Sequence, residues 1–115
     1  MARYVKMQRV PENVGTAGLR PMVKADVGAV HKLLNSYLEQ YKIHIQFTEA
    51  EIGHFLLPRE WVVESFVVEN HNNKITDFIS FYSLPSSVLK HPEHKILNVA
   101  YSYYNVPGAH KLVNL

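Results

Sequence analysis

Three runs of β-forming residues after residue 60 constrain the fold of this chain more than any other feature. Val, Ile, Phe and Tyr dominate the segments WVVESFVVE (61–69), KITDFISFYSL (74–84) and ILNVAYSYYNV (96–106). The polar turn NHNN separates the first two, so they predict an antiparallel hairpin. Both faces of the second run are mostly apolar, which predicts a central strand that is covered on each side. We therefore expect a three-stranded antiparallel meander.

A short strand and a helix are predicted before the meander. LRPM (19–22) can form only a short or edge strand, because Pro21 has no amide hydrogen to donate to a ladder. Asp26 can then cap a helix over residues 27–41. The apolar positions of that helix recur at the three- and four-residue spacing of an amphipathic helix: Val27, Val30, Leu33, Leu34, Tyr37, Leu38 and Tyr41.

A second helix is predicted over residues 49–56. Thr48 and Glu51 form a T-x-x-E capping box, which marks the first turn of a helix. Pro58 should end this helix, because the residue before a proline is pushed out of the α region. The two helices therefore lie between the short strand and the meander.

This order of elements predicts the fold class. A chain of 115 residues can bury enough surface for one domain. We expect a single partial α+β domain over residues 1–115, in which the two helices cover one face of the sheet. A short strand, two helices and a three-stranded meander form the opening half of an acetyltransferase-like layout. We therefore expect the domain to be incomplete and one sheet face to be uncovered.

Composition argues against several classes of function. The net charge is only +2 and the basic residues are scattered, so we expect no nucleic-acid partner. The absence of cysteine rules out disulfides, thiolate nucleophiles and Cys-based zinc sites in this sequence. No stretch approaches the ~18 apolar residues of a membrane span. We expect a cytoplasmic protein with no membrane span.

Few side chains are candidates for chemistry. His91 and His94 in HPEH could place two imidazoles on one metal ion, but without further ligands nearby a surface loop is favoured, and we predict no metal site. Asp77 lies in an apolar strand and must find partners, so a hydrogen-bonded structural role is favoured over a catalytic base. A turn is expected at LPSS (84–87), whose serines lack the surroundings of a nucleophile elbow.

Aromatic residues in the last two predicted strands allow two interpretations. They can be core residues at strand spacing, which is the favoured interpretation. Alternatively, they form the floor of a groove in which tyrosine hydroxyls orient a bound chain. Both interpretations concern the same six side chains: Phe78, Phe81, Tyr82, Tyr101, Tyr103 and Tyr104.

Beyond these patterns, the sequence resembles one enzyme family. Blocks of the glycylpeptide N-tetradecanoyltransferases, or N-myristoyltransferases, occur here in the same order and spacing. The resemblance covers about residues 9–106, and several blocks in register are far more specific than one short motif. The blocks are TAGLRPM (16–22), FLLPRE (55–60), FVVEN (66–70), TDFISFYSLPSS (76–87) and AYSYYNV (100–106).

The resemblance implies a cytosolic enzyme that moves a myristoyl group from myristoyl-CoA to the N-terminal glycine of a protein. It also implies two acetyltransferase-like (GNAT-type) halves, of which the first binds the acyl-CoA and supplies the oxyanion hole. The second half contributes most of the peptide groove, and this chain resembles its start. On that basis, Ser86 after Leu-Pro and Tyr101 at the start of YSYYNV are expected to line the peptide groove.

The sequence also departs from the family. Residues 107–115 form a divergent tail, whereas the family continues to a C-terminal carboxylate that deprotonates the glycine amine. We do not expect the carboxylate of Leu115 to replace that base. With no catalytic residue and no cofactor of its own predicted, the isolated chain should be inactive. It would need myristoyl-CoA as co-substrate, a glycine-initiated peptide and the missing acyl-CoA-binding half.

The alternative to an acyltransferase is a non-catalytic peptide- or protein-binding module that uses the aromatic sheet face.

Overall fold

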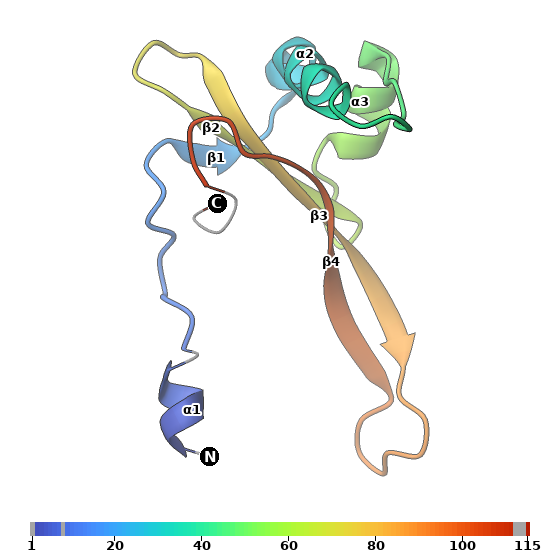
Figure 1. Ribbon diagram of the computed structural model, residues 1–115. Helices are drawn as coiled ribbons and strands as arrows, with labels where there is room; N and C mark the ends of the chain where they lie inside the picture. The colour runs from blue at the N-terminus through green and yellow to red at the C-terminus, as the bar shows by residue number, and fades with distance from the viewer. Residues whose placement is uncertain (1, 8, 112–114) are drawn as a thin grey trace.

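Four strands and two main helices form the body of the protein (Figure 1). The computed structural model describes residues 2–7, 9–111 and 115. The sheet is antiparallel throughout, with the strand order β1-β2-β3-β4. In chain order the elements are α1 (Ala2–Met7), β1 (Leu19–Pro21), the 3-10 turn η1 (Lys24–Asp26), α2 (Val27–Leu38), α3 (Glu49–Leu56), β2 (Val63–Glu69), β3 (Ile75–Ser87) and β4 (Ile96–Val106).

The meander and its central strand are confirmed. β3 lies between β2 and β4, and Phe78 pairs with Val67 on one side and with Val106 on the other. The short strand β1 adds to the outer side of β2, where Leu19 pairs with Val68. The α+β class predicted from the sequence is therefore correct, and β1 extends the meander to four strands.

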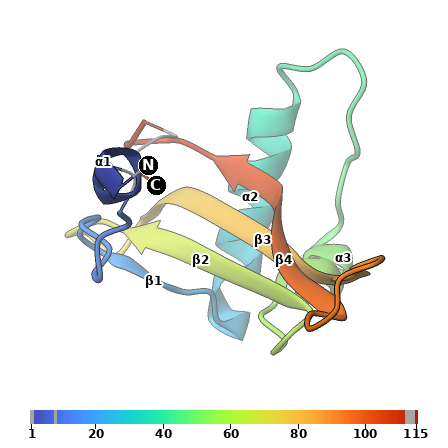
Figure 2. The same ribbon diagram turned by 90° about the horizontal axis from the view of Figure 1, so that it is seen from below.

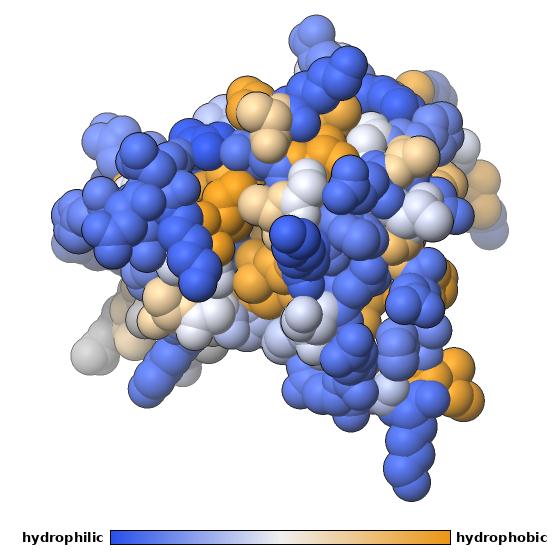
Figure 3. All heavy atoms as spheres, turned by 90° about the horizontal axis from the view of Figure 1, so that it is seen from above, coloured by the Kyte–Doolittle hydropathy of each residue, from blue (hydrophilic) through white to orange (hydrophobic). Residues whose placement is uncertain are grey.

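The two helices pack on one face of the sheet, and the main core lies between the two layers (Figure 2). Burying one leucine completely, as happens to Leu34, contributes roughly 2–3 kcal/mol. Seen from the side on which the helices lie in Figure 1, the surface is mainly hydrophilic, with apolar patches between the polar side chains (Figure 3). The buried core residues are Met22, Val30, Leu34, Leu38, Phe47, Ile52, Leu56, Val67, Phe78 and Val106.

Helix α3 begins and ends where the sequence predicts. The Thr48 Oγ1 accepts a hydrogen bond from the Glu51 amide, and the Glu51 carboxylate accepts one of 2.8 Å from the Thr48 amide. Leu57, which precedes Pro58, has an extended backbone with ψ of 134°. Both ends of this helix are therefore set by local sequence.

Two helical predictions differ from the structure. α2 ends at Leu38 instead of residue 41, and Tyr41 is 49% exposed, so its apolar spacing has no core to join. The N-terminal helix α1 was not predicted, because its sequence has no apolar periodicity. An extended segment separates α1 from the sheet (Figure 1).

The predicted LPSS turn is wrong, because β3 continues through Pro85 to Ser87. The Ser83 amide donates a hydrogen bond to the Val62 carbonyl on the β2 side of the strand. Successive backbone amides point to alternate sides of a strand, so the nitrogen of Pro85 points to the same side as that of Ser83. β2 begins only at Val63, so this side of Pro85 has no strand partner there and the missing amide hydrogen costs no ladder bond. The hairpin turn instead follows Ser87, and β3 and β4 extend well beyond β2 (Figure 1).

Candidate functional site

The two predicted groove residues lie on the same face of the β3–β4 hairpin. Tyr101 pairs directly with Tyr82, and Ser86 pairs with Leu97. Directly opposed residues share a face, and so do alternate residues along β3, so the side chains of Ser86 and Tyr101 share one face. Tyr82 also shares this face with Phe78, so it is the face on which the helices pack. The rise along β3 separates the Tyr101 and Ser86 pairs by about 13 Å.

Tyrosine rings follow one another from the core to the open end of this face. Tyr104 contacts Phe47 in the core, with ring centroids 5.2 Å apart. Tyr103 lies next to Tyr104 and meets the edge of Tyr82 at 5.5 Å. Tyr82 stacks on Tyr101 at 5.4 Å, with 15° between the ring planes. Since Tyr101 and Tyr103 are each 39% exposed, this series of rings ends in a flat aromatic surface.

The six aromatic residues named from the sequence therefore do not form one surface. Phe78 is fully buried in the core, and Tyr104 packs against it. Phe81 lies on the opposite face of the sheet, where it stacks on Phe66 with centroids 6.1 Å apart. The core interpretation holds for Phe78 and Tyr104, whereas Tyr101 and Tyr103 are available to a ligand.

One cavity borders this face of the hairpin, and a second lies beside the open end of the hairpin. The hairpin cavity, of about 420 Å³, lies between α3 and the strands, and its lining residues are His54, Phe55, Arg59, Val62, Val63, Tyr82, Ser102 and Tyr103. The strand-end cavity, of about 370 Å³, is lined by Trp61, Ser83, Leu84, Pro85, Asn98, Val99 and Ala100. Neither contains Ser86 or Tyr101, although Tyr82 joins Tyr101 to the hairpin cavity.

The lining residues that sequence reasoning missed include His54, Arg59 and Trp61. Trp61 has a φ of 60°, an unusual backbone angle for a bulky residue, and its side chain is 73% exposed. The sequence signal was the FLLPRE block, which links α3 to β2 and carries Arg59 next to the stop at Pro58. Arg59 lines a cavity only because α3 and β4, which are far apart in the sequence, lie on either side of it. The spacing of residues in the sequence does not reveal this arrangement.

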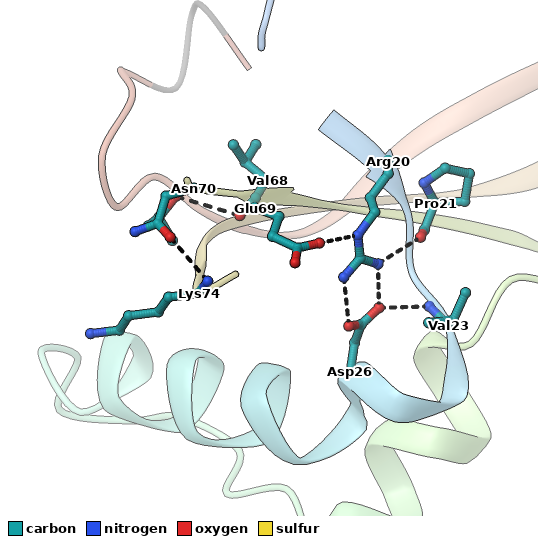
Figure 4. A network of polar contacts seen from close by, with 9 residues as sticks. Arg20, Pro21, Val23, Asp26, Val68, Glu69, Asn70 and Lys74 are labelled. Carbon is teal, nitrogen blue, oxygen red and sulfur yellow. Dashed lines mark hydrogen bonds and ion pairs between the residues drawn. The ribbon is translucent and has the colours of Figure 1, made fainter. Parts of the chain in front are cut away.

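A third cavity, of about 590 Å³, lies between α2 and the turn that joins β2 to β3. At its edge, Arg20 binds Asp26 through two hydrogen bonds of 2.7 and 2.9 Å and Glu69 through one of 2.5 Å (Figure 4). The hydrogen bonds from Arg20 hold the pKa of Asp26 below its usual value, and the Val23 amide adds to this effect. Both carboxylates are thus engaged in joining β1, η1 and β2, and neither is placed as a general base.

Asp77 has the hydrogen-bond partners that the sequence predicts it must find. It is fully buried, and it accepts hydrogen bonds from the Thr76 hydroxyl and from the Gly108 and His110 amides at 2.6–2.9 Å. The His110 ring lies 3.1 Å away. Burial raises the pKa of Asp77, but the hydrogen bonds from Thr76, His110 and Gly108 outweigh it and lower the pKa to about 2. The segment after β4 is thereby held against β3.

His91 and His94 lie in the exposed turn between β3 and β4, as the surface-loop interpretation predicted. The Nδ1 atom of His91 accepts hydrogen bonds from the backbone amides of Glu93 and His94 at 3.2 and 3.0 Å. Across residues 2–7, 9–111 and 115, no three His, Cys, Asp or Glu side chains are grouped so as to hold a metal ion.

Comparison with known proteins decides the family. Residues 1–114 match the family described as "Myristoyl-CoA:protein N-myristoyltransferase, C-terminal domain". The chain belongs to this family. As an N-myristoyltransferase C-terminal domain it has a GNAT-like fold, and the fold predicted from the resemblance is confirmed. The matched residues include those that follow β4.

Relatives of this N-myristoyltransferase domain are much longer proteins. The chain is 45% identical to glycylpeptide N-tetradecanoyltransferase 2 of Bos taurus over 115 residues, which is 100% of this chain and 23% of that protein. It is 48% identical to the probable enzyme of Caenorhabditis elegans over 110 residues, or 95% of this chain and 24% of that one. The chain thus spans about a quarter of the length of these relatives.

Solved structures agree with the sequence comparison. A crystal structure of Saccharomyces cerevisiae N-myristoyltransferase with bound myristoyl-CoA matches 90% of this chain and 25% of its own, with a TM-score of 0.82 and 35% identity. These findings favour the acyltransferase family over an unrelated binding module. Among the residues that the structure describes, no helix has the length and apolar character that a membrane crossing requires.

Proposed function

We propose that this chain forms one wall of the peptide groove of an N-myristoyltransferase, which transfers myristate from myristoyl-CoA to the N-terminal glycine of a protein. The observation that carries the proposal is the match of residues 1–114 to the C-terminal domain of that family. The β3–β4 pairing supports the assignment of Ser86 and Tyr101 to the groove, because both residues present hydroxyls on one face.

The chemistry of the two residues suits binding and orientation. Tyr101, supported from behind by the stacked ring of Tyr82, offers a flat apolar surface with a hydroxyl at its tip. The Ser86 hydroxyl can donate one hydrogen bond and accept others from a bound backbone. Together they would fix where an extended peptide lies along the hairpin.

The transfer itself needs groups that we assign to the rest of the enzyme. The glycine nitrogen attacks the thioester carbon, the carbon–sulfur bond breaks, CoA leaves as the thiol, and a base takes the proton from the amine. Neither Ser86 nor Tyr101 is proposed to be that base, and we assign no catalytic residue to the described part of this chain. The isolated chain is therefore proposed to bind peptide without acylating it.

Titration with a glycine-initiated peptide tests the groove. We expect Ser86→Ala and Tyr101→Ala each to weaken binding by roughly 2- to 10-fold, the loss expected for one hydrogen bond or one aromatic contact. Ser87→Ala is the matched control for the serine, because Ser87 is the next residue on β3 and faces the other side of the strand. Tyr41→Ala, at an exposed tyrosine beyond α2, is the control for the ring. Equal effects of Ser86→Ala and Ser87→Ala would contradict the groove assignment.

An acyl-transfer assay tests the division of roles. The purified 115-residue chain is incubated with labelled myristoyl-CoA and the same peptide. We expect no labelled peptide above the background without protein. Transfer by the chain alone would show that the catalytic groups are present and would overturn this part of the proposal.

We also propose a cytoplasmic location. The resemblance to a cytosolic enzyme family and the lack of cysteine in the sequence support it. Fractionation of cells that express the tagged chain would test it, and recovery in a membrane or organelle fraction would contradict it.

A further inference from the structure

Apolar and aromatic side chains form most of the wall of the hairpin cavity. Three aromatic rings, those of Phe55, Tyr82 and Tyr103, and two valines, Val62 and Val63, line it. Its volume of about 420 Å³ lies within the range of small-molecule sites. Phe55 and Val62 are 46% and 53% exposed, so apolar surface is still available to a ligand there.

The polar groups of this cavity are all donors or neutral groups. Its remaining lining residues are His54, Arg59 and Ser102, and none of the eight lining side chains is acidic. Within the described part of the chain, the hydrogen bonds of Arg59 are all made by its backbone. The Arg59 guanidinium therefore has no hydrogen-bond or ion-pair partner there. The His54 ring packs on Phe55 at 4.8 Å. The cavity therefore carries an unneutralised positive charge beside apolar walls.

The cavity beside α2, which Lys32 and Lys74 also line, differs in how its arginine is bound. There, Arg20 is neutralised by Asp26 and Glu69, both of which also line that cavity. A ligand anion would compete with two carboxylates already bound to the arginine. No such competitor lines the hairpin cavity.

We propose that the hairpin cavity binds a carboxylate carried on an aromatic or alkyl frame. The planar Arg59 guanidinium would bind the carboxylate, since its fork of donors matches that geometry. The rings of Phe55, Tyr82 and Tyr103 would enclose the frame. This assignment rests on the cavity alone and does not depend on the proposed acyltransfer function.

An NMR titration of the 115-residue chain tests the proposal with 3-phenylpropionate as the probe. The neutral 3-phenylpropionamide, which has the same frame, is the matched ligand control. We expect the acid to shift the amide signals of His54, Ser102 and Tyr103, and to bind about fivefold more tightly than the amide, as suits a partly exposed charge pair. Equal binding of the two ligands would overturn the charged part of the proposal, and shifts confined to other residues would overturn the site.

Substitution of Arg59 provides the second test. Arg59→Gln should weaken binding of the acid about fivefold and leave binding of the amide unchanged. The side chain of Arg59 is exposed, so this variant should keep the dispersed spectrum of the folded chain. Lys32→Gln removes one positive charge at the α2 cavity and should not affect either ligand. If Lys32→Gln weakens acid binding as much as Arg59→Gln does, the effect is one of net charge and the proposed contact is wrong.

Discussion

Asp77 shows how a carboxylate can be retained in an apolar strand. Its side chain has no exposed surface, and desolvation alone would favour the neutral acid. The Thr76 hydroxyl and the amides of Gly108 and His110 stabilise the charged form instead, and the His110 ring adds a partner 3.1 Å away when it carries a proton on Nδ1. The need for partners was predictable from the residue type. Their identity was not, because two of the partners lie more than thirty positions along the chain.

The lowered pKa of Asp77 makes stability depend on pH. Its stabilising contribution should be complete above the ordinary aspartate pKa of about 4 and should be lost as the pH falls toward about 2, because the unfolded chain takes up the proton first. We expect Asp77 to account for ~2 kcal/mol of the loss measured by urea unfolding at pH 6 and at pH 2.5, a range in which Asp26 and Glu51 also titrate from lowered pKa values. Asp77→Asn should be less stable at pH 6 and should lose less on acidification. Glu60→Gln, at an exposed carboxylate, is the control, and an equal change in both variants would contradict the assignment.

Elements were predictable where their signals are local. The start of α3 follows from the Thr48 and Glu51 side chains, and its end follows from Pro58. The course of β3 through Pro85 was missed, because a proline in a strand is tolerated only where no strand pairs with its amide side, and the point at which β2 begins depends on the tertiary structure. Tertiary structure also decides the end of α2: the apolar periodicity predicts that the helix runs to residue 41, but no core residues lie near Tyr41 to bury its ring.

The segment after β4 gives a prediction for an element that the sequence left unassigned. A Cβ at position 108 would lie 1.9 Å from the Thr76 carbonyl oxygen, so Gly108→Ala should displace this segment from β3 and break the amide bond to Asp77. We expect a loss of about 1–3 kcal/mol in the free energy of unfolding. Gly15→Ala is the matched control, since no atom lies within 4 Å of that Cβ, and it should change stability by less than about 0.5 kcal/mol. Similar losses in both variants would rule out the close approach.

The whole molecule has its main core on one side of the sheet. The helices cover Phe78, whereas Phe66 and Phe81 on the opposite face remain half-buried. The expectation of an uncovered face is therefore met in part, since the segment that binds Asp77 covers one end of that face. The groove residues Ser86 and Tyr101 stay predictions at this scale: their shared face follows from the register, whereas their role in peptide binding rests on the resemblance.

Two phenylalanines three positions apart on β3 test this asymmetry. Phe78→Ala should cost about 3–5 kcal/mol, because it opens a cavity in the closed core. Phe81→Ala should cost only about 1–2 kcal/mol, because its ring is half-exposed and water can fill the space. Urea unfolding of both variants measures the difference. Equal losses would indicate a second closed core on the opposite face.

The extension of β3 and β4 beyond β2 has a mechanical consequence. Beyond Ser83 the hairpin is a two-stranded ribbon, which twists and bends more readily than a sheet held on both sides. Tyr101 sits where the ribbon leaves the three-stranded region, and Ser86 sits on the free arm. The distance between the Ser86 and Tyr101 hydroxyls therefore depends on how far this ribbon bends. A partner that packed along the ribbon and held it rigid would fix that distance.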